Sequence, residues 1–306
     1  MKPLEQPIPT SPQISVVIPC YNQGDYLIET LTSVLTEQDC ELEVIVVNDG
    51  STDNTREVAE QFFGRIRYIE HANRGAAEAR NDGMRVASCD LIHVLDSDDL
   101  VRPGFYRAML AAAKANSDFD VFISDRDYID AGGNRTGSSR TGKIAGDPLH
   151  RLMRRNIGEP CCFVVRRTAY EKVGEYRPVY CADWDMWLRI AASGSQFLPV
   201  HEARAAYRQH PGGMSANLGK MWEMSQAVLA ANRNHHHHCR QCRASYRSGR
   251  LYVNYACVSG LIYHIGWRKL VSSERKVIAK IILTNPWTGV VFLAKHLGRS
   301  FKRQKN

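Results

Sequence analysis

Short apolar runs and helical apolar spacings alternate over the first 125 residues. Short apolar or β-branched runs predict strands at 14–19, 42–47, 90–95 and 120–124, and alternating polar and apolar residues predict one at 65–69. Between them, apolar residues recur every three or four positions, as at Leu27, Leu31 and Val34, which predicts amphipathic helices. Strands that alternate with helices predict βαβ units, and therefore an α/β fold with a mostly parallel sheet. Ligands of such sheets collect beyond the carboxyl ends of the strands.

The pattern changes along the second half of the chain. Residues 131–155 are rich in Gly, Ser and Arg and predict a long surface loop. A strand is expected at 161–166, a helix at 183–192, and only helices after about residue 215. We therefore expect a flexible tail over 1–12, an α/β domain over 13–215, and a helical extension over 216–306 that ends in a basic tail.

Charge and cysteine content suggest the surroundings of the protein. The formal net charge is +8, and Arg299, Lys302, Arg303 and Lys305 crowd the last eight residues, after an interrupted apolar stretch at 277–297. This order favours an amphipathic element on an anionic membrane face, with a helix packed on the protein as the alternative. Nine cysteines, an odd number, indicate reduced thiols. With no apolar leader and no long apolar run, we expect a cytoplasmic protein, peripheral on the inner face of the membrane.

Two turns that carry carboxylates directly follow predicted strands. Asp49 follows the run at 42–47, and Asp96-Ser97-Asp98-Asp99 follows the run at 90–95. Asp96 and Asp98 share a face of an extended segment, and hard oxygen ligands there suit Mg²⁺ or Mn²⁺. The alternative is that these aspartates cap helices, Asp49 the helix that starts near Asp53 and the others the helix around Pro103.

A series of short motifs resembles a known family. They are Ile18-Pro19-Cys20-Tyr21-Asn22, Val46 to Asp53, Asn73-Arg74-Gly75 with Ala79-Arg80-Asn81, Leu95 to Asp99, Ala182 to Arg189, and Tyr207-Arg208-Gln209-His210. In this order they resemble the motifs of the family 2 glycosyltransferases over roughly 14–215. The resemblance implies the GT-A fold of nucleotide-diphospho-sugar transferases, a mixed, mostly parallel sheet flanked by helices. It also implies an inverting, metal-dependent enzyme that transfers a sugar from a nucleotide-sugar, typically a UDP-sugar, to an acceptor hydroxyl.

The resemblance also implies a role for each matching residue. Pro19 and Tyr21 would border the nucleotide base, Asp49 would bind that base, and Arg80 would lie near the base or the diphosphate. Asp96 would contact the ribose or the metal, and Asp98 and His210 would bind the metal. Asp183 would be the general base that takes the proton from the acceptor. In the family the residue before the general base is commonly Glu, whereas here the residue before Asp183 is Ala182. Asp183 and Asp185 face different directions on a helix, so only one can address the acceptor. Trp184 and Trp187 could stack on an acceptor sugar, but their helical spacing favours a core position.

The implied partners are a nucleotide-sugar donor and a saccharide or lipid-linked acceptor, as in the synthesis of cell-surface polysaccharide or glycolipid. The basic residues form no recognised nucleic-acid module, so no nucleic acid is expected. A sugar nucleotidyltransferase is a weaker alternative, because it would need a glycine-rich basic loop where the chain has Cys20 to Asp25. A further alternative is a catalytically silent protein that binds nucleotide-sugars or acts as a membrane scaffold.

A cluster of potential metal ligands lies near the C-terminus. His235 to His238 are followed by Cys239 and Cys242. A lone Cys-x-x-Cys lacks the second pair of a zinc finger, and the side chains of adjacent histidines diverge. The sequence therefore argues against zinc here.

Overall fold

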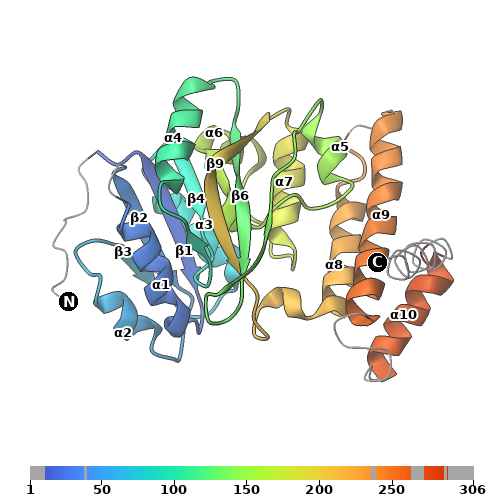
Figure 1. Ribbon diagram of the computed structural model, residues 1–306, viewed down its shortest axis with the longest axis horizontal. Coiled ribbons are helices and arrows are strands. Elements are labelled where there is room, and N and C mark those ends of the chain that lie inside the picture. Colours follow the sequence, from blue (N-terminus) through green and yellow to red (C-terminus); the bar gives the residue numbers. More distant parts are fainter. Residues whose placement is uncertain (1–10, 38–39, 236–238, 263–271, 286–287, 289–306) are drawn as a thin grey trace, which may run out of the picture. The chain divides into compact units, whose positions relative to one another are not determined.

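The computed structural model describes residues 11–37, 40–235, 239–262, 272–285 and 288. The chain divides into two compact units (Figure 1). The first contains residues up to 148 together with 157–210, and the second contains 149–156 and the residues from 211 onward. All the residues that the sequence predicts for a sugar-nucleotide site belong to the first unit.

A twisted mixed sheet forms the centre of the first unit. Its strands are ordered β3-β2-β1-β4-β8-β6-β9-β5, and β7 pairs with β6. The strands are β1 (Ile14–Cys20), β2 (Leu42–Asn48), β3 (Arg67–Glu70), β4 (Leu91–Val94), β5 (Leu100–Val101), β6 (Val121–Ile129), β7 (Arg135–Ser139), β8 (Phe163–Arg166) and β9 (Phe197–Arg208). The first four are joined by parallel pairs, whereas β8 runs antiparallel to both β4 and β6. The carboxyl ends of β1, β2 and β4 therefore meet at one edge.

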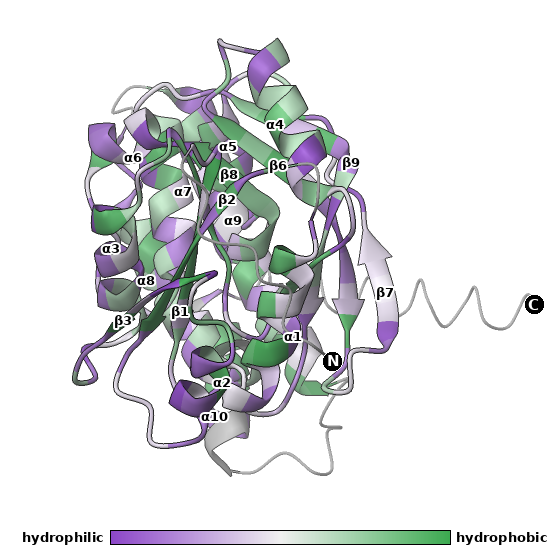
Figure 2. Cartoon of the chain, turned by 90° about the vertical axis from the view of Figure 1, so that its left-hand side faces the viewer, coloured by the Kyte–Doolittle hydropathy of each residue, from purple (hydrophilic) through white to green (hydrophobic). Residues whose placement is uncertain are grey.

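Helices cover both faces of this sheet. They are α1 (Gly24–Leu35), α2 (Thr55–Glu60), α3 (Ala76–Val86), α4 (Phe105–Ala115), α6 (Arg167–Val173) and α7 (Ala182–Ala192). Helices α3, α6 and α7 lie on one face, and α1 and α4 lie on the other (Figures 1 and 2). Figure 2 also shows hydrophobic colouring along the central strands, in contrast to the pale and hydrophilic β7.

Close packing sets the position of α3. Every residue of β1 and β2 is buried, as expected for strands covered on both faces. Gly83 of α3 lies directly on β1, where an added Cβ would come within 2.2 Å of Val17 Cγ1. Because Gly83 has no side chain, α3 approaches the sheet closely, and its polar residue Arg80 is carried toward the carboxyl edge.

Parts of the sheet differ from the sequence prediction. The segment 131–155, expected to be a loop, contains β7 and also the short helix α5 (Pro148–Leu152). Strand β7 is polar and largely exposed, so no apolar pattern marks it, and it forms by pairing with β6. Strand β9 was not predicted because its charged residues, such as Glu202 and Arg204, interrupt the apolar alternation.

The second unit is helical in its described part, as the sequence predicts. It contains α8 (Leu218–Ala231), α9 (Arg240–Gly260) and α10 (Ser272–Thr284). Its core consists of the buried residues Cys257, Val258, Leu261, Ile278 and Ile281. Among the described residues, no helix is long and apolar enough to cross a bilayer. The predicted basic tail lies outside the described residues.

Candidate active site

Asp49 anchors the loop that leads into α3. Its carboxylate is buried and accepts the backbone N–H of Arg74 at 2.7 Å and that of Gly75 at 2.8 Å. Gly75 has φ +93°, which favours glycine over other residues at this turn. Asp49 therefore fixes the start of α3, whereas Asp53 accepts the N–H of Thr55 at the start of α2. The base contact expected of Asp49 remains a prediction.

The turns after β1 and β2 are tied together beside Asp49. The N–H of Asn22 donates to Ser51 Oγ at 2.9 Å, and Asn22 Oδ1 accepts the N–H of Thr52 at 2.8 Å. Pro19 is buried within β1, whereas Tyr21 on this turn is 48% exposed. The exposed ring at a strand end is thus available for stacking.

Arg80 joins α3 to the turn after β4. This arginine is only 8% exposed, and its Nη2 lies 2.6 Å from Asp96 Oδ1. Its guanidinium also lies over the ring of Tyr176, 5.6 Å from the ring centroid. Burial lowers the pKa of Arg80, but the charges of Asp96, Tyr176 and Asp183 raise it, and the net shift is upward. Arg80 is thus a permanent cation whose field reaches two predicted site carboxylates.

Asp98, two residues after Asp96 on the same turn, contacts His210. His210 Nε2 lies 2.9 Å from Asp98 Oδ2, and both side chains are mostly buried. Burial and the charge of Asp96 raise the pKa of Asp98, while His210 opposes the shift. Burial and the charges of Asp98 and Asp96 raise the pKa of Asp99 well above its ordinary range.

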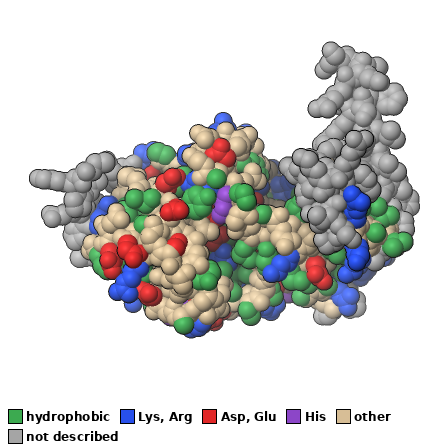
Figure 3. Space-filling view, turned by 90° about the horizontal axis from the view of Figure 1, so that it is seen from below, with side chains coloured by type: hydrophobic (Ala, Val, Ile, Leu, Met, Phe, Trp, Pro, Cys, Tyr) green, Lys and Arg blue, Asp and Glu red, His purple; other side chains and the backbone are tan. Residues whose placement is uncertain are grey.

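Three carboxylates, those of Asp96, Asp98 and Asp99, thus crowd one turn beside Arg80. Two carboxylates and an imidazole are a donor set that suits Mn²⁺ or Mg²⁺. A divalent cation would relieve their repulsion, so the residues fit the predicted metal. Asp and Glu side chains and a histidine are visible on the face seen from below (Figure 3).

Asp183 and Asp185 have different surroundings on α7. Asp185 is buried and pairs with Arg189 Nε at 2.9 Å. Asp183 is partly exposed, and its charge acts on Arg80, Tyr176 and Glu159. The structure therefore brings Asp183, Arg80 and Asp96 into one electrostatic group.

The two tryptophans of α7 lie in the core, in line with their helical spacing. Trp184 is 4% exposed and Trp187 is 1% exposed. Trp187 stacks on Phe163, with ring centroids 4.1 Å apart. In this structure neither ring offers an open face to a sugar.

Comparison with known proteins identifies the family. A family model described as "Glycosyl transferase family 2" matches residues 15–174, which is slightly more than half of the chain. The chain belongs to glycosyl transferase family 2. The predicted resemblance is therefore confirmed.

Curated relatives of this family 2 chain match it over different lengths. "Uncharacterized glycosyltransferase YibD" of Escherichia coli (strain K12) is 37% identical over 119 residues, which cover 38% of this chain and 34% of YibD. "Succinoglycan biosynthesis protein ExoU" of Rhizobium meliloti (strain 1021) is 28% identical over 250 residues, which cover 72% of this chain and 70% of ExoU. The match with YibD thus spans about a third of that protein.

Solved structures confirm the predicted GT-A fold. S. aureus TarS (residues 1–349) in complex with UDP-GlcNAc has a TM-score of 0.62 at 16% identity, covering 88% of this chain and 79% of that chain. Mannosyltransferase PcManGT from Pyrobaculum calidifontis, in complex with GDP-Man and Mn²⁺, has a TM-score of 0.61 at 18% identity, and the match covers 97% of this chain and 88% of PcManGT. At such low identity the likeness concerns the fold alone.

Two residues of this family 2 site have no sequence-derived role. The first is Arg208 of β9, whose side chain is fully buried. Its Nε donates to the carbonyl of Asp98 at 2.7 Å, Nη2 pairs with Glu29 at 2.7 Å, and its backbone N–H donates to Asp99 Oδ1 at 2.8 Å. Arg208 thus holds the turn Asp96–Asp99 in place. Its place in the Tyr207–His210 motif is the signal that could have revealed it.

The second is Glu159, just before the 3-10 turn Pro160–Cys162. Burial raises the pKa of this carboxyl, Arg126 opposes that shift, and the charge of Asp183 adds to it. Glu159 Oε2 lies 3.1 Å from Arg126 Nε. A second acidic group therefore stands near Asp183, although the position before Asp183 is Ala182. No local pattern in the sequence marks Glu159.

Proposed function

We propose that the protein is an inverting, metal-dependent glycosyltransferase that transfers a sugar from a UDP-sugar to an acceptor hydroxyl in cell-surface polysaccharide or glycolipid synthesis. One observation carries the proposal. Arg80, Asp96 and Asp183 form one electrostatic group on three elements, and Asp98 of the same turn pairs with His210. UDP-GlcNAc in TarS supports a UDP-sugar donor, Mn²⁺ in PcManGT supports a divalent metal, and the name of ExoU supports polysaccharide synthesis.

The donor would lie across the carboxyl edge of β1, β2 and β4. Tyr21 and Pro19 would border the base and Asp49 would contact it, while Arg80 would face the diphosphate side. Asp98 and His210, with Asp96, would hold Mg²⁺ or Mn²⁺, which when bound supplies positive charge to the departing diphosphate. Arg208 and Thr30 hold this turn from two sides, since Thr30 Oγ1 lies 2.8 Å from Ser97 O. These bonds hold the turn in place without a bound donor.

Asp183 would act on the acceptor. The acceptor oxygen attacks the anomeric carbon as the bond from that carbon to the diphosphate oxygen breaks, and Asp183 takes the hydroxyl proton. Attack from the face opposite the leaving group inverts the anomeric configuration. Asp183 is partly exposed, as a base that meets an incoming acceptor must be, whereas Asp185 is buried against Arg189.

An anionic acceptor or membrane partner is supported by the second unit. It contains a pocket of about 480 Å³ that is lined in part by Arg233, Arg243, Arg247 and Arg250. On α10, Leu283 is 81% exposed although Ile281 is buried. Lys and Arg side chains lie near hydrophobic ones on the right of Figure 3. Arginines suit phosphate groups, and an exposed apolar side chain suits a bilayer surface, so we propose peripheral binding to an anionic membrane that carries a lipid-linked acceptor.

A nucleotide panel tests the donor assignment. Thermal unfolding is measured with UDP, GDP and dTDP, each with Mn²⁺ and with EDTA. We expect the largest rise in Tm with UDP and Mn²⁺, because a ligand at 100 times its Kd adds about 2.7 kcal/mol to the free energy of unfolding. Preference for GDP would reassign the donor, and equal shifts in EDTA would contradict metal dependence. A catalytically silent protein would show the UDP shift and yet release no UDP from any UDP-sugar.

A further inference from the structure

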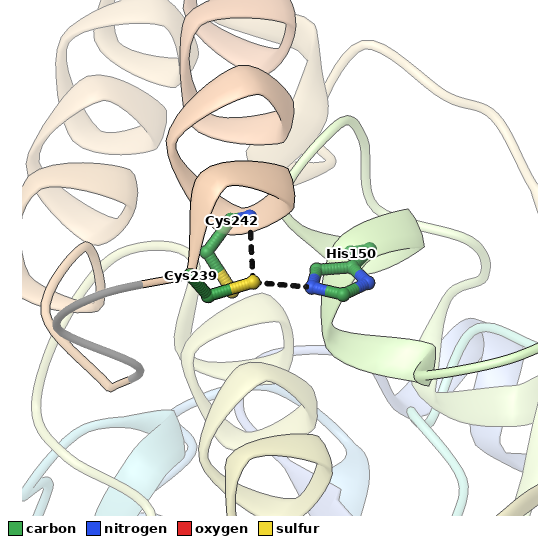
Figure 4. A group of neighbouring side chains, drawn as sticks. All are labelled: His150, Cys239 and Cys242. Atoms are coloured by element: carbon green, nitrogen blue, oxygen red, sulfur yellow. Dashed lines mark hydrogen bonds between the residues drawn. The ribbon is translucent and has the colours of Figure 1, made fainter.

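Three metal-ligating side chains of the second unit face one another. His150 lies on α5, Cys239 is the N-cap residue of α9, and Cys242 lies in the first turn of α9 (Figure 4). Their ligand atoms all lie within 4.8 Å of one another. His150 Nε2 is 3.3 Å from Cys239 Sγ, which also accepts the backbone N–H of Cys242 at 3.3 Å. Because His150 and Cys239 are 89 positions apart, no sequence pattern joins them.

The donor set and spacing match zinc chemistry. Zn–S bonds of about 2.3 Å and Zn–N bonds of about 2.0 Å place neighbouring ligand atoms of a tetrahedral site about 3.3–3.8 Å apart. The observed distances need only small side-chain adjustments to reach these values. Two cysteine thiolates with an imidazole are soft and borderline ligands, which favour zinc over magnesium or calcium. The N-terminus of the 21-residue helix α9 further stabilises negatively charged sulfur.

The surrounding packing holds these ligands together. At Gly249 of α9, an added Cβ would come within 1.9 Å of the carbonyl oxygen of Met153. Arg154 Nε donates to Ser245 Oγ on the same helix at 3.2 Å. The segment 149–156 is therefore pressed against α9 over more than two turns, with His150 at the N-terminal end of the helix. The ligands converge because of this packing.

We propose that His150, Cys239 and Cys242 bind a structural zinc ion that fastens segment 149–156 to the N-terminus of α9. The three side chains supply three of the four ligands of a tetrahedral site. The first-unit turn Asp96–Asp99 offers hard oxygen ligands, so the two sites call for different metals. The role of zinc here is independent of sugar transfer, since it lies in the folding of the second unit.

Zinc content of the full chain, purified without metal-affinity steps, tests the proposal. We expect about one zinc per chain in the wild type and in the control Cys40→Ser, and loss of that zinc in Cys242→Ser and His150→Asn. The run His236–His238 can bind zinc by itself, so a chain with these three residues changed to Ser is measured beside them. Zinc that persists in Cys242→Ser and His150→Asn but disappears with the histidine run would overturn the proposal.

Cobalt substitution gives a readout that does not require the variants to fold. Co²⁺ added to the apo wild-type chain should produce a thiolate-to-cobalt charge-transfer band, and Zn²⁺ should abolish it. Zinc removal by a chelator should lower Tm in the wild type. Absence of the band, or a Cys239–Cys242 disulfide in the freshly purified protein, would contradict the assignment.

Discussion

Asp183 and Asp185 are two positions apart on α7, yet their surroundings differ. Asp185 forms a buried ion pair with Arg189, and Asp183 lies in the field of Arg80. Asp183→Asn should lower the rate of sugar transfer by about 10²–10⁴-fold, the range for a lost general base, with donor binding retained. Asp185→Asn should keep activity per folded molecule but lose about 3 kcal/mol of stability, because Arg189 stays buried without its partner.

Transfer kinetics, donor titration and thermal unfolding of the two variants separate these effects. Undiminished transfer by Asp183→Asn would remove this residue from the mechanism. A fully stable Asp185→Asn would contradict its structural role.

Short motifs at strand ends contain most of the candidate site residues, and the structure shows which of them lie close together. Asp96, Asp98 and His210 lie in such motifs, and the structure brings Asp98 and His210 into contact. Arg208 and Glu159 could not be assigned roles in this way, because their importance depends on partners far away in the chain. The bonds from Asp49 to the backbone of Arg74 and Gly75 also required the folded loop.

At the scale of elements, a buried histidine of β4 predicts how stability depends on pH. His93 Nε2 donates to the carbonyl of Cys161, so its neutral ring accepts from the Tyr106 hydroxyl through Nδ1. Burial lowers the pKa of His93 to about 3. Below its unfolded pKa of about 6.5, the unfolded chain gains a proton that the folded chain does not take up.

The neutral His93 ring therefore costs no stability above pH 7, and the free energy of unfolding declines as the pH falls from 7 toward 3. Between pH 7 and pH 5 the free energy of unfolding of the wild type should fall by about 2 kcal/mol more than that of His93→Gln, which has no titrating ring. Denaturant unfolding at the two pH values measures this difference. Equal losses in the two proteins would show that His93 titrates normally in the folded state.

Whether a strand can be predicted from the sequence depends on how much of it is buried. Strands β1, β2 and β4 are apolar because helices cover both of their faces, so composition reveals them. Strands β7 and β9 escaped prediction, since β7 is exposed and β9 carries charged residues that pair across the sheet, such as Arg204 with Asp127. Their existence depends on β6, a partner that the local pattern does not contain.

At the scale of the whole molecule, the second unit offers a test of membrane association. Leu283→Asp should weaken binding to anionic vesicles at least about tenfold, because burial of a leucine side chain contributes about 1.5–3 kcal/mol. Ile28→Asp on α1, where Ile28 is 41% exposed, is the matched control and should bind as the wild type does. Co-sedimentation with vesicles measures the binding of both variants.

Point variants suit this test better than truncation at Val277, since Ile278 and Ile281 belong to the core of the unit. Equal binding by all three proteins would contradict a membrane role for α10.

We propose the turn Asp96–Asp99 as the place where a cation and a nucleoside diphosphate bind together. Calorimetric titration of the nucleoside diphosphate that most stabilises the protein, in Mn²⁺ and in EDTA, tests this directly in the wild type, Asp98→Asn and the exposed control Asp118→Asn. We expect the wild type and the control to bind in Mn²⁺ and to lose at least about tenfold in affinity in EDTA, the effect of about 1.4 kcal/mol. Asp98→Asn should bind weakly and equally in both. Wild-type affinity in Asp98→Asn, with its Mn²⁺ dependence intact, would contradict the central claim.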